Sequence, residues 1–266
     1  MRADTPPLRK PRRTVALMYH ALSRGHAPPG QDPHYTLDEA VFRGQLQQIQ
    51  RAGGACSVRD WLRDDERRPV LLTFDDGHAS NYEVAFPALA EYGMRADFFV
   101  NPANVGTPGF ATWAQLREMS DAGMSIQSHG YDHSYFTDLA APVLRERLHA
   151  AHVRIEDGVG AAATLLAPPG GRMPVGLVGI ARQCGYLHVV SSRPGRMAAS
   201  RRTAILPRLA VTAPLDPRRF NAWVDGGATS ILREQLRYGS LSLAKQLLGD
   251  SRYERARMLA LAGRRG

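Results

Sequence analysis

Two acidic residues and two histidines in this 266-residue sequence have the types and spacing of a metal site. Asp75 and Asp76 follow an apolar run and precede Gly77, a residue that permits a sharp turn. Neighbouring residues leaving a strand point in different directions, so one carboxylate can bind a cation while the other reaches past it. His129 and His133 are four residues apart, which would place both imidazoles on one side of a helical turn. One carboxylate and two imidazoles are the ligand set of a catalytic zinc with an open position for water, and the same ligands can bind non-haem iron(II).

Each half of this pattern also has a simpler interpretation. An aspartate beside a turn glycine is a common N-cap of a helix, and two histidines can share a surface by chance. Their joint occurrence, each at the end of an apolar segment, favours the metal site. No glutamate follows His129, so the His-Glu-x-x-His arrangement of zinc proteases is excluded.

The surrounding sequence predicts the elements that must position these residues. Short apolar segments alternate with longer segments of helical period, as is typical of a parallel α/β sheet. The predicted strands are 15–20, 70–74, 96–100, 124–129, 163–167, 187–191 and 205–211. The predicted helices are 38–53, 82–93, 112–122, 139–157, 174–184 and 216–226.

This order predicts a (β/α) barrel, distorted or incomplete, over residues 14–227. Residues 1–13 are predicted to be a disordered basic lead, and residues 228–266 an Arg-rich helical C-terminal extension. In such a barrel the active site lies at the C-terminal ends of the strands. Those ends carry the polar or glycine-rich positions His20, Asp75, Asp76, Asn101, His129 and Pro168–Gly171.

Several motifs occur in an order that resembles a known family. They are LMYHAL (17–22), RPVLLTFDDG (68–77), ADFFV (96–100), SHGYDH (128–133) and the strand that ends in Pro-Gly-Gly (169–171). Over about residues 14–211 the chain resembles the polysaccharide deacetylases of carbohydrate esterase family 4, the NodB-homology domain. The LMYH opening and the late LPR (206–208) look most like the exopolysaccharide-deacetylase branch. The resemblance implies a distorted (β/α)7 barrel that removes acetyl groups from sugars.

The resemblance also implies roles for individual residues. Asp75 is similar to the general base that takes a proton from metal-bound water, and Asp76, His129 and His133 are similar to the metal ligands. Gly170 is similar to the position whose backbone N–H binds the oxyanion. One divalent ion is expected, zinc first, with cobalt, nickel, manganese or iron as alternatives.

Two family features have no match in this sequence. The usual Arg-x-Pro-aromatic-Gly motif is replaced by Ala167-Pro168-Pro169-Gly170-Gly171, so its arginine is missing, and Arg208 is the candidate substitute. The late Leu-x-His that supplies a general acid is also missing. His20 is the candidate acid, with a histidine ligand as the alternative.

Three further residues are predicted to line the substrate site. They are His78, Tyr131 and Pro169, each beside one of the motifs. The predicted substrate is an N-acetylated amino sugar, and the predicted product is acetate with a free amine. Two alternatives stay open: a deformylase or other C–N amide hydrolase on the same fold, and a sugar-binding barrel without catalysis.

Composition narrows the expected partners. The chain has 34 Lys and Arg against 25 Asp and Glu, a net charge of +9, which favours anionic partners. No nucleic-acid motif accompanies this charge, so no nucleic-acid partner is expected. The expected substrates are a nucleotide sugar, a lipid-linked sugar or a glycosylated metabolite. For the C-terminal extension two alternatives stay open: contact with an anionic membrane, or a solvated helical face that packs on the barrel. Two cysteines are too few for a disulfide framework. Without an apolar stretch of roughly 7–15 residues near the N-terminus, the expected location is the cytoplasm.

Overall fold

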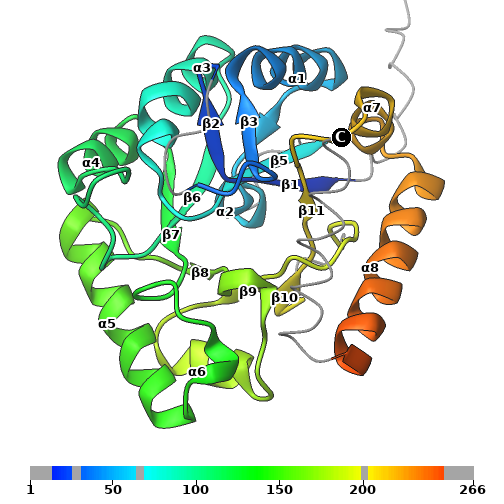
Figure 1. Ribbon diagram of the computed structural model, residues 1–266. Coiled ribbons are helices and arrows are strands. Elements are labelled where there is room, and N and C mark those ends of the chain that lie inside the picture. The colour runs from blue at the N-terminus through cyan, green and yellow to red at the C-terminus, as the bar shows by residue number, and fades with distance from the viewer. Residues whose placement is uncertain (1–13, 26–30, 64–68, 199–202, 249–266) are drawn as a thin grey trace, which may run out of the picture.

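The computed structural model describes residues 14–25, 31–63, 69–198 and 203–248 (Figure 1). The predicted disordered lead, residues 1–13, and the end of the predicted extension, residues 249–266, lie outside the described residues.

Most of the strands form one parallel sheet that curls around the centre of the molecule (Figure 1). Its strands are β1 (Val15–Tyr19), β4 (Ala55–Cys56), β5 (Val70–Phe74), β6 (Ala96–Val100), β7 (Ser125–Ser128), β8 (Leu165–Leu166), β9 (His188–Val190), β10 (Ile205–Leu206) and β11 (Leu209–Ala210). Their order is β10-β9-β8-β7-β6-β5-β1-β11, with β4 also paired to β5. A second, two-stranded parallel sheet joins β2 (Ala21–Ser23) to β3 (Thr36–Asp38). The predicted distorted (β/α) barrel is confirmed, and the short strands β2, β3 and β4 were not predicted.

Most helices lie on the outer side of the curled sheet, whereas α2 packs against the inner cluster through Val58 and Trp61 (Figure 1). The α-helices are α1 (Glu39–Ala52), α2 (Val58–Leu62), α3 (Phe86–Glu91), α4 (Trp113–Asp121), α5 (Ala141–Val159), α6 (Leu177–Gln183), α7 (Pro217–Val224) and α8 (Ala228–Leu248). A π-helical turn, η1 (Asn81–Ala85), leads into α3, and two 3₁₀ turns are η2 (Phe136–Asp138) and η3 (Pro169–Gly171). Within the described ranges, no helix is long and apolar enough to cross a membrane.

The two faces of the strands have different neighbours, because successive side chains of a strand point to opposite sides. Leu72 and Phe74 belong to the larger cluster, which includes the buried faces of the surrounding helices. Leu71 belongs to a smaller cluster with Ala16, Phe99 and other residues of the barrel interior. Thr73 and Asp75 continue the alternation that begins at Leu71. The sequence therefore places these two polar side chains inside the barrel, above its apolar lining.

One predicted strand is divided in two. The predicted strand 205–211 contains β10, which pairs with β9, and β11, which pairs with β1 at the opposite edge of the sheet. Pro207 and Arg208 lie between the two pieces, and proline has no N–H to donate to a strand ladder. The prediction of a single strand was therefore wrong. The divided segment instead joins the two edges of the open barrel and leaves Arg208 at the break.

Helix α8 begins at Ala228, the first residue of the predicted extension, and its first turns contact α7 (Figure 1). Ile231 is buried in this contact. Glu234 forms an ion pair with Arg219 of α7, and Gln235 Nε2 donates to the carbonyl of Pro194 at 3.3 Å. These contacts attach the described part of α8 to the barrel.

Candidate metal and catalytic site

The predicted site residues lie at the C-terminal edge of the sheet, where the strands lead into loops. His20 follows β1, Asp75 and Asp76 follow β5, His129 follows β7, and Pro168–Gly171 follows β8. Since the strands are parallel, their C-terminal ends meet at one edge. Residues far apart in the sequence are thereby brought to one place.

Arg208 holds Asp75 through both carboxylate oxygens. Arg208 Nη1 donates to Oδ1 at 2.6 Å and Nη2 donates to Oδ2 at 2.8 Å, and both side chains are buried. Nη1 also donates to Thr73 Oγ1 at 3.1 Å, and Nε donates to the carbonyl of Ser191 at 3.2 Å. Burial alone raises the pKa of Asp75, but Arg208 and, after it, His129 hold that pKa below its usual value. Asp75 is therefore ionised at neutral pH and fixed in orientation, with Arg208 where a substitute for the motif arginine was expected.

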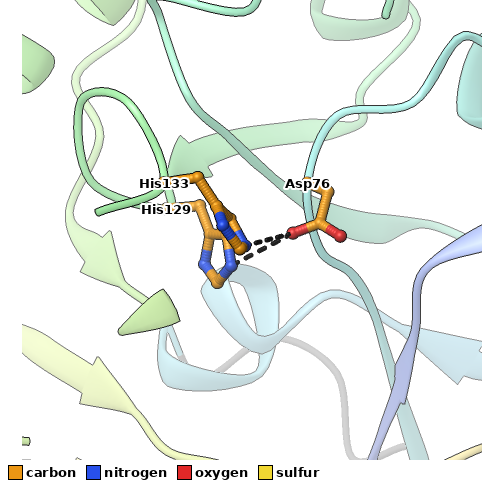
Figure 2. A group of neighbouring side chains, drawn as sticks. All are labelled: Asp76, His129 and His133. Atoms are coloured by element: carbon orange, nitrogen blue, oxygen red, sulfur yellow. Dashed lines mark ion pairs between the residues drawn. The ribbon is translucent and has the colours of Figure 1, made fainter. Parts of the chain in front are cut away.

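Asp76, His129 and His133 converge on one point (Figure 2). Asp76 Oδ1 lies 3.2 Å from Nε2 of His129 and 3.2 Å from Nε2 of His133. Asp76 and His133 both have positive φ, 76° and 64°, a conformation that is uncommon for residues other than glycine. The backbone is therefore bent at both positions to bring these side chains together.

The three residues fit a divalent cation. Two ligand atoms on a tetrahedral zinc, each about 2.0–2.1 Å from the metal, lie roughly 3.3 Å apart, close to the spacings found here. Asp76 Oδ1 is buried and has no hydrogen-bond partner within the described ranges. His129 Nδ1 lies 2.8 Å from the carbonyl oxygen of Ala167 and must carry a proton to donate to it. In the neutral ring, Nε2 then presents a lone pair toward Asp76, as a metal ligand requires.

The carboxylate of Asp76 is strongly acidic in this setting. Burial raises its pKa, but the contacts with His129, His133 and His78 outweigh burial and hold the pKa well below its usual value. The carboxylate in turn raises the pKa of His133. Asp76 is thus the anionic centre around which the imidazoles gather.

The expected helical turn between the two histidines was wrong. Residues 129–135 form an irregular loop, and the positive φ of His133 turns its ring back toward His129, so that the ring centres lie 5.3 Å apart. Asp132, inside this loop, pairs with Arg147 at 2.6 Å. The structure brings the two histidines together through a loop, and not through the helical turn on which the spacing argument relied.

His20 lies at the same edge of the barrel and is electrostatically coupled to Asp75 and Asp76. Its ring centre is 4.5 Å from that of Tyr35, and its carbonyl accepts from Asn81 Nδ2 at 2.8 Å. Burial is the largest influence on its pKa, which is lowered, with the two carboxylates acting in the opposite direction. His20 Nδ1 is buried and has no hydrogen-bond partner among the residues that the structure describes. The structure therefore places His20 beside the site, with its Nδ1 atom available to form a hydrogen bond.

The loop after β8 approaches the histidine loop closely. Gly170 has a φ of 59°, and a Cβ at this position would lie 2.7 Å from the ring of Tyr135. Pro169 is buried, and its ring lies near Gly130. The structure thus requires glycine at position 170, where an oxyanion donor was predicted.

The other two residues predicted to contact substrate, Tyr131 and His78, lie in different parts of the site. Tyr131 is exposed, between the two histidine ligands, and its carbonyl accepts from the backbone N–H of Ala103. His78 faces Asp76 instead, with Nε2 3.4 Å from Oδ2. His78 is therefore in contact with a predicted ligand, whereas Tyr131 lies at the rim of the site.

Two supporting residues were not assigned roles from the sequence. Asn101, at the end of β6, is buried and donates from Nδ2 to the carbonyl of His129. Its position at a strand end was a usable signal. Gln31 lies in the segment between β2 and β3, and its Nε2 lies 3.1 Å from His78 Nδ1. Nothing in the local sequence distinguishes Gln31 from a surface glutamine.

A curled parallel sheet with a carboxylate, two imidazoles and an arginine-bound aspartate at its C-terminal edge defines a (β/α) barrel with a candidate metal site. Residues 63–189 match the sequence model of the family described as Polysaccharide deacetylase. This segment matches the polysaccharide deacetylase family, as the motifs in the sequence predicted, and the match indicates a hydrolase that removes acetyl groups.

Individual relatives agree with this assignment. The polysaccharide deacetylase homologue YxkH of Bacillus subtilis (strain 168) is 26% identical to this chain over 216 residues. The alignment covers 81% of this chain and 77% of YxkH. Among solved structures, the deacetylase PplD of Streptococcus pyogenes, in complex with acetate, has a TM-score of 0.70 at 24% identity and covers 79% of this chain and 96% of its own. IcaB from Ammonifex degensii has a TM-score of 0.66 at 23% identity, and the superposition covers 80% of this chain and 97% of the IcaB chain. The two structures establish the shared fold, and the exopolysaccharide branch stays a prediction.

Proposed function

We propose that this protein is a metal-dependent N-deacetylase that acts on an amino sugar. The observation that carries the proposal is an ionised carboxylate, Asp75, held by Arg208 directly beside a group of ligands that fits a divalent cation. The family match supports removal of an acetyl group from a sugar.

Asp76, His129 and His133 would hold the cation, with zinc proposed ahead of cobalt, nickel, manganese and iron. The lone pairs of one carboxylate and two imidazoles suit all of these ions. When bound, such a cation lowers the pKa of water and polarises a carbonyl group.

Asp75 is proposed to accept the proton of the attacking water. Arg208 occupies one lone pair on each carboxylate oxygen, and the lone pairs that remain can take a proton. Because Asp75 is ionised at neutral pH, it is in the form that a general base needs. Arg208 acts through Asp75 by fixing the direction of these lone pairs.

The other two proposed groups act on the substrate. The backbone N–H of Gly170 would donate to the oxygen that becomes negative when water adds to the acetyl carbonyl. His20 would donate a proton to the nitrogen of the departing amine. The lowered pKa of His20 makes its imidazolium form a stronger acid, although a smaller fraction of it is protonated at neutral pH.

The substrate is proposed to be a nucleotide sugar, a lipid-linked sugar or a glycosylated metabolite, and the first two of these classes carry phosphate. The net charge of +9 supports an anionic substrate. Tyr131 is proposed to contact the sugar at the rim, whereas the buried Pro169 supports the loop that carries Gly170. The structure adds no support for membrane contact. A cytoplasmic location stays a proposal that cell fractionation would test.

Metal analysis of the purified protein, coupled to an acetate-release assay over a panel of N-acetylated sugars, tests this function. We expect about one divalent ion per chain and release of acetate that Asp75→Asn abolishes. Formate release from N-formyl sugars in preference to acetate would support a deformylase instead. Sugar binding with no acyl release, and no difference between wild type and Asp75→Asn, would indicate a binding barrel.

A further inference from the structure

His78 contacts the side of Asp76 that faces away from the two histidine ligands. His129 and His133 approach Oδ1, whereas Nε2 of His78 lies 3.4 Å from Oδ2. His78 is not part of the group of atoms that could share a cation, which comprises Asp76, His129 and His133 among the described residues. The two oxygens of Asp76 therefore have different neighbours.

Gln31 determines which nitrogen of His78 carries the proton. Its Nε2 lies 3.1 Å from His78 Nδ1, and an amide nitrogen can only donate, so Nδ1 accepts. In the neutral imidazole the single proton is then on Nε2, the nitrogen that faces Asp76 Oδ2. Gln31 and His78 thus form a chain of two donors that ends at the carboxylate.

Phe110 fixes the plane of the His78 ring. The two rings are stacked, with centres 5.3 Å apart and planes 18° apart, and the backbones of the two residues form an isolated antiparallel bridge. The neighbouring backbone adds two hydrogen bonds, from Ala79 N–H to the carbonyl of Gly109 and from Ala111 N–H to the carbonyl of Gly77. His78 is thus held in place by backbone as well as by Gln31, and its proton has a fixed direction.

We propose that His78 is a positioning residue that, with Gln31, occupies Oδ2 of Asp76 and so presents Oδ1 to the cation. This inference rests on the proposed metal site and assigns His78 a role other than the substrate contact predicted from the sequence. A carboxylate with one oxygen occupied binds through the other, and outer hydrogen bonds of this kind typically change metal affinity by about 10- to 100-fold. Asp76 has a positive φ of 76°, and the contact with His78 is one of the interactions that hold its side chain in place.

Two substitutions separate hydrogen bonding from packing. His78→Phe keeps an aromatic ring that can stack on Phe110 but has no donor. His78→Gln loses the aromatic ring but carries an amide nitrogen that can occupy the position of Nε2. Gln31→Leu removes the donor to Nδ1 and leaves the imidazole in place. His149→Ala, at an exposed position on α5, controls for the loss of a histidine elsewhere.

Cobalt(II) binding by the full chain, followed by visible absorption and by competition with zinc, is the direct measurement. We expect His78→Phe to weaken cobalt(II) binding about 10- to 100-fold, His78→Gln to recover most of the wild-type affinity, and Gln31→Leu to weaken it by a smaller factor. Thermal melting of the metal-free proteins should be similar for wild type and His78→Phe. His149→Ala should bind like wild type.

The results distinguish this inference from the proposed function. Wild-type affinity in His78→Phe, with loss in His78→Gln, would show that His78 only packs against Phe110 and would overturn its positioning role. A wild-type protein that binds neither cobalt(II) nor zinc(II) would overturn the metal site itself.

Discussion

Arg208 and Asp75 are 133 residues apart in the sequence, yet they form a two-pronged ion pair at the C-terminal edge of the barrel. The pair depends on two local features. Asp75 continues the inward-facing alternation of β5, and Arg208 lies at the break between β10 and β11, where Pro207 interrupts the strand ladder. The interruption that leaves the barrel incomplete therefore also supplies the partner of the proposed general base.

Replacing Arg208 should lower both stability and activity. Arg208→Met leaves a buried carboxylate without its partner, and breaking a buried pair in this way costs about 3–5 kcal/mol of unfolding free energy. Arg208→Lys keeps a charge but not the two-pronged geometry, so we expect a smaller loss of stability and a clear loss of kcat. Urea unfolding and acetate release measure these effects, with Arg145→Met on the exposed face of α5 as the matched control.

The pH dependence of the same variants tests the cause. Arg208 holds the folded-state pKa of Asp75 below its unfolded value, so its stabilisation is present above that unfolded value and is lost as pH falls through the lower, folded value. The difference in unfolding free energy between wild type and Arg208→Met should therefore shrink in acid, and the acid limb of kcat/KM should move to higher pH in the variant. A difference that does not change with pH would contradict an electrostatic role for Arg208.

Much of the site could be predicted because its residues follow regular strands. Asp75, Asp76 and His129 each lie at the end of a predicted strand, and parallel strands place such positions at one edge whatever the details of the loops. Arg208 could be proposed by elimination, because the motif arginine was missing. The bidentate contact could not be predicted, since it requires the break at Pro207.

The parts that sequence could not predict depend on loop backbone and on pairing between distant segments. His133 reaches Asp76 through a positive φ, which its residue type does not indicate. Gln31 contacts His78 across 47 residues, and both lie in loops without periodicity. Strands of two or three residues, such as β4, are too short to produce a pattern of alternation.

Changing Asp75 or Asp76 to asparagine should impair different functions of the protein. Asp76→Asn removes a negative ligand, so cobalt(II) or zinc(II) affinity should fall at least about 100-fold, with activity lost in parallel. Asp75→Asn should still bind the cation and lose only acetate release. A chelator should abolish wild-type activity, and zinc added back should restore it. Equal loss of metal binding in both variants would show that the division of roles between the two carboxylates is wrong.

His20 should matter more for an amine leaving group than for a phenolate. His20→Gln is expected to lower kcat on an N-acetylated sugar about 100-fold or more, because the departing nitrogen needs a proton. On 4-nitrophenyl acetate the leaving phenolate is stable without a proton, so the same variant should lose little. Metal content should be unchanged. Equal losses on both substrates would assign His20 to a step before the leaving group departs.

Asp97 gives the stability of the barrel a pH dependence that is separate from catalysis. Its side chain is completely buried, and its Oδ2 accepts from the backbone N–H of Val58 at 2.5 Å. Burial is the main cause that raises the pKa of Asp97 from 3.8 to about 6. Between these two values the folded chain holds a proton that the unfolded chain has released, so stability falls as pH rises, by about 3 kcal/mol in total. Asp97→Asn keeps an acceptor for Val58 and cannot titrate. Urea unfolding should therefore show that the unfolding free energy of the variant, relative to that of wild type, rises by roughly 3 kcal/mol between pH 4 and pH 7. Parallel stability curves for the two proteins would mean that Asp97 is ionised in the folded barrel at both pH values.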